Sequence, residues 1–172
     1  MHIDADFPGG NILVEQLDGD RAVLRPDWRD SSWWFYWYFR ASGAAGRTVR
    51  FELRDPNWVL SALGPCVSTD GETWAWLGPP EAVNTFTYAF APAVDAAWFT
   101  IGLPYLERHL RAFLAARPAI RVATLAVSER GRPIEHLEIP ARTGRYAVLF
   151  TARHHASEAA ANYVLEGILD YW

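Results

Sequence analysis

The sequence has a single cysteine, no lysine and no long hydrophobic run, and each shortage narrows what the protein can be. With Cys66 alone, an internal disulfide framework is excluded, which fits a reducing compartment. Every one of the 16 basic residues is arginine, and the 20 acidic residues leave a net charge of −4. Because a general nucleic-acid binder presents a basic face, we expect no nucleic-acid partner.

The chain also lacks the marks of secretion and of membrane insertion. Its first ten residues contain neither the basic segment nor the apolar core of a secretory signal. Its longest aromatic run, Trp33 to Phe39, is far shorter than the roughly 20 apolar residues that span a bilayer. We therefore expect a soluble, cytoplasmic protein with no membrane partner.

Apolar material, in contrast, is abundant: 51% of the residues are hydrophobic and 15% are aromatic. Between residues 11 and 103 this material is divided into short strands by turns, such as the hairpin signal Asp18-Gly19-Asp20. Residues 85–90 alternate polar and aromatic side chains, the period of a strand with one wet face. About seven to nine such strands without a long helical period predict a mainly β protein with an antiparallel β-sandwich.

The aromatic run raises a question about its two sides. In a strand, alternate residues face opposite sides, so one set would fill the sandwich and the other needs cover from elsewhere. Trp33, Trp37 or Trp74 could instead line a face that stacks on sugar rings or peptide side chains. We favour core or junction packing, because large aromatic side chains bury much apolar area.

A helix and a hairpin are predicted after the sandwich. Residues 105–117 carry apolar side chains at helical spacing and end at Pro118, which indicates a connecting helix. Within it, His109 is interpreted as a solvated surface residue. Residues 120–127 and 133–139 predict two strands joined at a glycine turn, with His136 on the outward side.

The last part of the chain predicts a strand, a loop and a helix. Tyr146 to Thr151 is a continuous apolar run, typical of a strand that is buried on both faces. Ser157 can cap a helix that continues to Trp172. The expected apolar stripe of this helix is Ala160, Val164, Ile168 and Tyr171. A buried strand that feeds a helix through a short loop is where open α/β sheets bind ligands.

Two residues of that loop, His155 and Glu158, are the candidate metal ligands. Imidazole nitrogen and carboxylate oxygen both bind zinc, and a catalytic zinc takes three protein ligands and a water. A carboxylate in the first helical turn is kept ionised by the helix dipole. A lone His-x-x-Glu pair is a weak signal, and the alternative is a solvated histidine beside an exposed glutamate. The strand–loop–helix context favours the metal site.

The segment Arg153-His-His-Ala-Ser-Glu158, followed by Ala-Ala-Ala-Asn-Tyr-Val-Leu-Glu-Gly-Ile-Leu-Asp, resembles the zinc-binding segment of family M14 metallocarboxypeptidases. The cytosolic carboxypeptidases and their bacterial relatives are the branch it resembles most. Segments that resemble the β-sandwich preceding the peptidase domain in that branch are Gly10-Asn11-Ile12, Trp33 to Phe39, Gly64 to Ser68, Asp70 to Trp74 and Leu103-Pro-Tyr105. The chain departs from the family at Ala156-Ser157, where Pro-Gly is usual, and this concerns loop shape rather than metal binding.

The resemblance implies a zinc enzyme that hydrolyses C-terminal peptide bonds or side-chain branches, with glutamate as a candidate. A peptide or protein C-terminus would be the substrate, and His155 and Glu158 would be the first two zinc ligands. The third ligand, the groups that hold the substrate carboxylate and the general base are expected beyond Trp172. No catalytic residue is therefore assigned in this chain, its substrate-binding residues stay unknown, and the roles of Arg153 and His154 are left open.

The same resemblance implies a division of the chain into a β-sandwich domain (1–104), a connecting helix (105–118) and the incomplete start of a zinc carboxypeptidase α/β domain (119–172). We expect the chain to be the N-terminal part of a larger enzyme and to be inactive alone. Two alternatives remain: a non-catalytic β-sandwich binding or interaction module with a vestigial metal motif, and a metal-independent scaffold that dimerises through a sheet edge.

Overall fold

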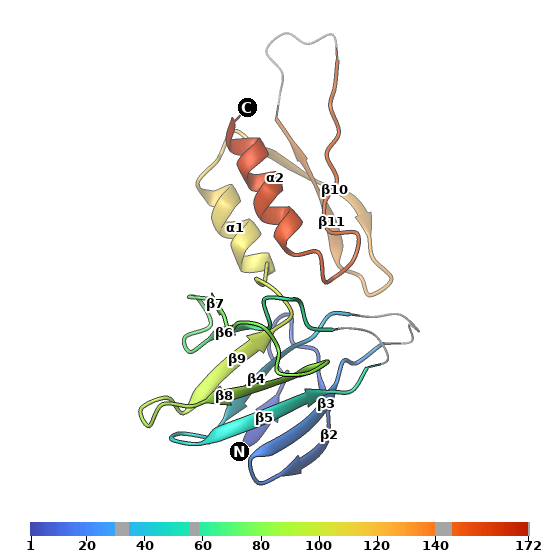
Figure 1. The fold of residues 1–172 in the computed structure, drawn as a ribbon. Coiled ribbons are helices and arrows are strands. Elements are labelled where there is room, and N and C mark those ends of the chain that lie inside the picture. The colour runs from blue at the N-terminus through green and yellow to red at the C-terminus, as the bar shows by residue number, and fades with distance from the viewer. Residues whose placement is uncertain (30–34, 56–58, 140–145, 172) are drawn as a thin grey trace.

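The computed structural model describes residues 1–29, 35–55, 59–139 and 146–171. In its N-terminal part, nine described strands form two sheets that pack face to face (Figure 1). In spatial order the first sheet consists of β1 (His2–Asp4), β4 (Tyr38–Ser42), β9 (Ala96–Thr100), β6 (Cys66–Ser68) and β7 (Ala75–Trp76). The second consists of β2 (Leu13–Asp18), β3 (Arg21–Arg25), β5 (Thr48–Leu53) and β8 (Thr85–Ala89). The predicted sandwich is confirmed, with the β2–β3 hairpin turning at Gly19 (φ 52°).

One described strand pair departs from the antiparallel prediction: β3 and β5 run parallel, with Ala22 opposite Phe51. Their parallel course follows from the path of the chain, because β4, which lies between them in sequence, belongs to the other sheet. The reversal at residues 41–46 therefore joins strands of different sheets. A turn signal in the sequence marks the reversal, but it cannot say which sheet the next strand enters.

The core lies between the sheets and is built from phenylalanine rings of both. Phe99 of the first sheet lies 5.0 Å from Phe51 and 5.5 Å from Phe86 of the second, measured between ring centroids. Phe39 reaches Phe51 across the same gap at 5.5 Å. Trp37 is fully buried beside them, and its Nε1 donates a hydrogen bond of 2.7 Å to the carbonyl of Val59. These contacts hold the sheets together, since large aromatic side chains dominate core energetics.

The aromatic run uses both of its sides, as the strand period predicts. Tyr36 and Tyr38 face away from the core and are covered by Phe7, Trp74 and Leu106. Burial raises the pKa of both tyrosines to about 12. The expected cover at the junction is thus confirmed.

The stacking hypothesis receives no support from the described tryptophans that it named. Trp37 is enclosed in the core, and Trp74 packs edge-on against Tyr38 with 5.7 Å between ring centroids. Trp33, the third residue of that hypothesis, lies outside the described residues.

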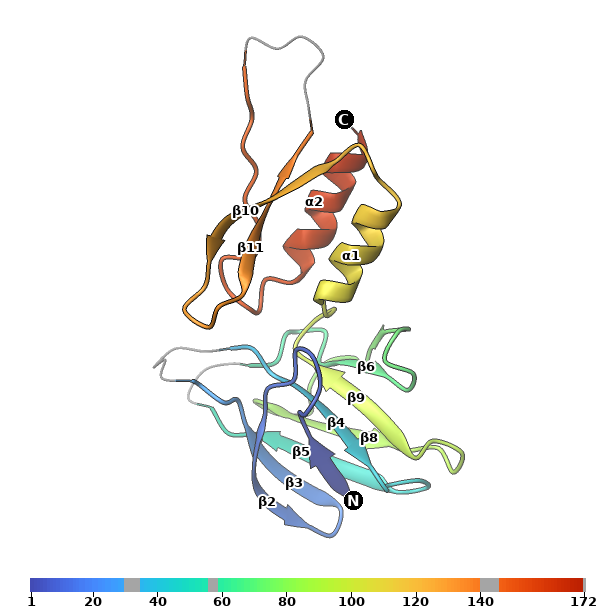
Figure 2. The ribbon, with the colours of Figure 1, turned by 180° about the vertical axis from the view of Figure 1, so that it is seen from behind.

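Beyond the sandwich lie helix α1 (Glu107–Ala115), the hairpin β10 (Arg121–Val127) and β11 (Pro133–Glu138), and helix α2 (Ala160–Tyr171). The two helices lie side by side in both views (Figures 1 and 2) and are joined by the ion pair of Arg117 with Asp170. The hairpin is confirmed, with Gly131 at a positive φ in its turn and His136 exposed. Neither described helix has the length and apolar character needed to cross a membrane.

The predicted buried strand at 146–151 is wrong for this chain. None of the described strands pairs with this segment, and the side chains of Tyr146 and Leu149 are 87% and 79% exposed. A strand buried on both faces requires neighbouring strands and covering layers, and the described residues supply neither to it.

Helix α2 also differs from its prediction. It begins at Ala160 rather than directly after Ser157, and its expected apolar stripe is largely outward, with Val164 65% and Tyr171 84% exposed. The helix is instead held by residues that flank α1: Asp170 pairs with Arg117, two residues after α1, and Glu166 accepts a hydrogen bond of 2.7 Å from the hydroxyl of Tyr105, two residues before it.

His109 is not the solvated residue that the sequence suggested. It is half-buried, and its Nδ1 accepts a hydrogen bond of 2.8 Å from the backbone N–H of Leu106 at the start of α1. This bond satisfies one of the unpaired donors of the helix N-terminus. Burial and the charge of Arg108 lower the pKa of His109, whereas Glu72 and Glu166 act in the opposite direction.

Because the folded state lowers this pKa, the unfolded chain binds the proton more readily. We therefore expect the free energy of unfolding to fall as the pH drops below the ordinary histidine pKa of 6.5. The His109→Gln variant should lose this part of the pH dependence, and His109→Ala should cost about 1 kcal/mol at pH 8. Urea unfolding between pH 8 and pH 5 measures both effects, with His136→Gln as the exposed control. Equal pH slopes for wild type and His109→Gln would show that folding does not lower the pKa of His109, and unchanged stability of His109→Ala at pH 8 would show that the cap contributes nothing.

Candidate metal centre

The structure brings the two predicted ligands into direct contact. His155 and Glu158 lie in the loop that leads into α2, with 2.7 Å between His155 Nδ1 and Glu158 Oε1. The backbone N–H of His155 donates to Glu158 Oε2 at 3.1 Å, and that of Glu158 donates to the carbonyl of His155 at 3.1 Å. Two backbone-linked bonds and one side-chain contact thus fix the pair as one tight turn.

The charge state and the exposure of the pair suit a metal site. Hydrogen bonds from the ring and backbone of His155 lower the pKa of Glu158, so its carboxylate is ionised, the form that binds a metal. The side chains of His155 and Glu158 are 76% and 43% exposed. Both are therefore accessible to an ion from solvent.

The ring nitrogen of His155 and the carboxylate of Glu158 are donors that suit zinc, and the distance between them is slightly shorter than a bound zinc requires. Two ligands about 2.1 Å from a tetrahedral zinc are about 3.4 Å apart, so the pair at 2.7 Å would have to open slightly to admit the ion. Within the part of the chain that the structure describes, no group of three or more His, Cys, Asp or Glu side chains gathers around one point. His154 is exposed beside the pair, while His2, His109 and His136 belong to other elements. These residues thus offer two of the three protein ligands that a catalytic zinc takes.

Arg153, whose role the sequence left open, attaches this loop to the segment that precedes α1. Its guanidinium donates from Nη1 to the carbonyl of Tyr105 and from Nη2 to the carbonyl of Ala156 at 3.4 Å. Ala156 in turn packs against the cluster that Tyr36, Tyr38 and Leu106 form. The loop with the metal ligands is thus attached to the junction beside the sandwich.

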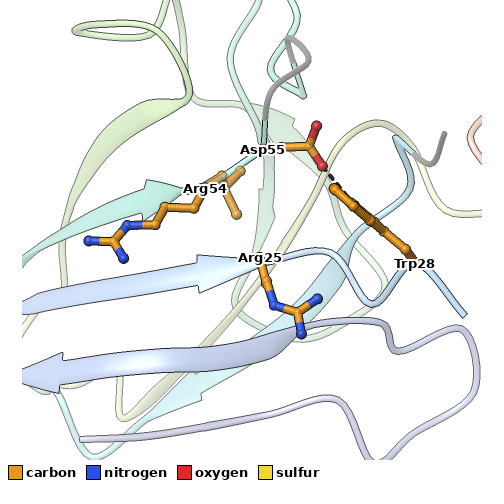
Figure 3. Close-up of a pocket in the computed structure, with 5 residues that line it drawn as sticks. Arg25, Trp28, Arg54 and Asp55 are labelled. Carbon is orange, nitrogen blue, oxygen red and sulfur yellow. Dashed lines mark hydrogen bonds between the residues drawn. The ribbon is translucent and has the colours of Figure 1, made fainter. Parts of the chain in front are cut away.

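A separate hollow on the sandwich does not resemble a binding site. It is lined by Arg25, Trp28, Leu53, Arg54 and Asp55 (Figure 3). Arg25 and Arg54 each pair with Glu15 at 3.3 Å, and Figure 3 shows their guanidinium groups pointing in different directions. Because these charges are already paired and do not converge, the hollow adds nothing to the candidate metal centre.

Comparison with known proteins identifies a family for more than half of the chain. The family model described as the cytosolic carboxypeptidase N-terminal domain matches residues 3–101. The uncharacterized protein ZMO1242 of Zymomonas mobilis is 28% identical over 179 residues, which cover 99% of this chain and 47% of that protein.

Two solved structures share the fold. The metallo-carboxypeptidase from Burkholderia cenocepacia has a TM-score of 0.77 at 23% identity, covering 98% of this chain and 48% of that one. The metallo-carboxypeptidase from Pseudomonas aeruginosa, in complex with (2-guanidinoethylmercapto)succinic acid, has a TM-score of 0.76 at 25% identity, covering 99% and 48%. The chain thus spans about half the length of the relatives it matches.

Proposed function

Because the chain belongs to the family of the cytosolic carboxypeptidase N-terminal domain, we propose that it is the N-terminal part of a zinc-dependent metallocarboxypeptidase, to which it supplies two zinc ligands. The observation that carries the proposal is the contact of 2.7 Å between His155 and Glu158, in a chain whose fold is that of metallocarboxypeptidases. We assign 1–104 to the β-sandwich domain, 105–118 to the connecting helix and 119–172 to the start of the peptidase domain. The end of the family match at residue 101 supports the first boundary.

The proposed reaction is hydrolysis of a C-terminal peptide bond or of a side-chain branch, with glutamate as a candidate and the cytoplasm as its location. Zinc, when bound, supplies a Lewis acid for the scissile carbonyl and lowers the pKa of water toward neutrality. The chain's own part is to present one ring nitrogen and one ionised carboxylate oxygen on a loop fixed beside the sandwich. The ligand of the Pseudomonas aeruginosa protein is a succinic acid derivative and so carries two carboxylates. This supports a substrate that ends in a carboxylate.

Removal of the metal tests this function. In the longer protein that we propose contains this chain, peptides with a free C-terminus or a glutamate branch should be hydrolysed, and a C-terminally amidated peptide should be spared. Incubation with a zinc chelator should abolish hydrolysis, and added zinc should restore it. A folded, zinc-loaded protein without activity on any of these peptides would favour the non-catalytic module instead. Activity that persists after complete removal of zinc would exclude the metal's role.

A further inference from the structure

We propose that Arg153 is the positioning residue that keeps His155 and Glu158 in contact, by fastening their loop to the linker that precedes α1. The inference rests on the proposed function insofar as it concerns the same two ligands. It adds a residue whose guanidinium bonds the carbonyls of Tyr105 and Ala156 rather than either proposed ligand.

The backbone of the loop needs such a fastening. Arg153 has a φ of 59°, in the left-handed region that residues other than glycine adopt at a cost in free energy. The contact between His155 and Glu158 lies in solvent, with their side chains 76% and 43% exposed. Because an exposed ion pair contributes little to stability, this contact and the two hydrogen bonds between His155 and Glu158 hold the turn itself, but none of them holds Arg153 in its left-handed conformation.

The guanidinium of Arg153 attaches the loop at two points. One nitrogen donates to the carbonyl of Tyr105, 48 residues earlier, and the other to the carbonyl of Ala156 at 3.4 Å. Ala156 directly follows His155, so one end of the clamp is a single residue from a metal ligand. The planar fork of arginine allows one side chain to serve two acceptors in fixed directions, which the single ammonium of lysine cannot do equally well.

The linker is a firm anchor because three successive residues fix it to different elements. The carbonyl of Pro104 accepts a hydrogen bond of 2.8 Å from the hydroxyl of Tyr163 in α2. The hydroxyl of Tyr105 donates to Glu166 in the same helix at 2.7 Å. Leu106 packs against the sandwich tyrosines. A loop clamped to this linker therefore keeps its position relative to both α2 and the sandwich.

Three variants of the 172-residue chain separate positioning from general stability. Arg153→Ala removes the clamp, and Arg153→Lys retains the charge with one compact donor group. Arg117→Ala is the matched control, because Arg117 also bridges two elements, through Asp170 and the carbonyl of Phe113, but does not touch the loop. Two quantities are measured by NMR: the exchange rate of the Glu158 amide, which donates to His155, and the response of the His155 ring signals to zinc sulfate.

In Arg153→Ala we expect the Glu158 amide to exchange about tenfold faster and zinc to bind at His155 about tenfold more weakly, the lower end of the effect of losing an outer-shell partner. Arg153→Lys should recover part of both losses, and Arg117→Ala should leave both at wild-type values. If wild-type His155 does not respond to zinc, the exchange rate alone decides the clamp, because this chain offers two of the three protein ligands and the proposed function is decided in the longer protein. Wild-type exchange in Arg153→Ala would overturn the inference whatever zinc does. Should that variant not fold, wild-type exchange and affinity in Arg153→Lys would overturn the two-point clamp.

Discussion

Replacement of Phe99 by alanine is expected to lower the free energy of unfolding by about 3–5 kcal/mol. Phe99 is fully buried, and the rings of Phe39, Phe51 and Phe86 lie 5.0–5.5 Å from it, so the deletion opens a cavity where the two sheets meet. Because a native domain has about 5–15 kcal/mol of stability in all, the variant should be marginally folded at 25 °C. Urea unfolding followed by tryptophan fluorescence measures the change.

The matched control for this substitution is Val83→Ala. Val83 is 67% exposed, so its loss should change stability by less than about 0.5 kcal/mol. Phe99→Leu should fall between the two, since it keeps most of the buried volume. If Phe99→Ala were within about 1 kcal/mol of wild type, the two sheets would not be held together around this ring.

Replacement of either His155 or Glu158 by alanine should remove peptidase activity from the longer protein while the sandwich stays folded. Zinc as a Lewis acid stabilises the transition state by several kcal/mol. The loss of one of its ligands should therefore lower kcat/KM by about 10³-fold or more. Both side chains are exposed and neither belongs to the core. Circular dichroism and thermal unfolding of the variants should therefore match the wild type.

His154→Ala is the control for that pair of variants, because it removes a neighbouring, exposed imidazole, whereas the ring that contacts Glu158 is that of His155. We expect it to retain activity within about tenfold of wild type, a loss of at most about 1.4 kcal/mol in transition-state stabilisation. Retention of more than a tenth of the activity by His155→Ala or Glu158→Ala would contradict their assignment as ligands.

Features that depend on neighbouring residues in sequence could be predicted without the structure. The β2–β3 hairpin follows from Asp18-Gly19-Asp20, and the two-sided aromatic run follows from the strand period at Tyr36 to Phe39. The pairing of His155 with Glu158 follows in the same way from their spacing at the entrance to a helix. In each case the signal and the contact lie within a few residues of each other.

Features set by distant parts of the chain were missed. The parallel pairing of β3 with β5 depends on which sheet β4 enters, and the sequence at the turns does not record it. Arg153 finds its acceptor on Tyr105, 48 residues away. The apolar segment 146–151 has the composition of a buried strand, but composition cannot supply the neighbours that such a strand needs.

His109 is an intermediate case. Its acceptor role is local, since it bonds the backbone three residues before it at the helix start. A histidine at the third helical position can take the part that glutamate or glutamine has in a capping box. The position of His109 in the helix therefore indicates the cap, whereas the flanking arginines favour the interpretation of His109 as a solvated surface residue.

The zinc content of the longer protein tests the central claim most directly, because it requires no knowledge of the substrate. After removal of all metal, the wild type, His154→Ala, His155→Ala and Glu158→Ala are each titrated with zinc, and the bound metal is measured per chain. We expect one tightly held zinc in the wild type and in His154→Ala, and binding weaker by more than about 100-fold in His155→Ala and Glu158→Ala, a larger effect than the loss of an outer-shell partner. One tightly held zinc in all four proteins would contradict the assignment of His155 and Glu158 as its ligands.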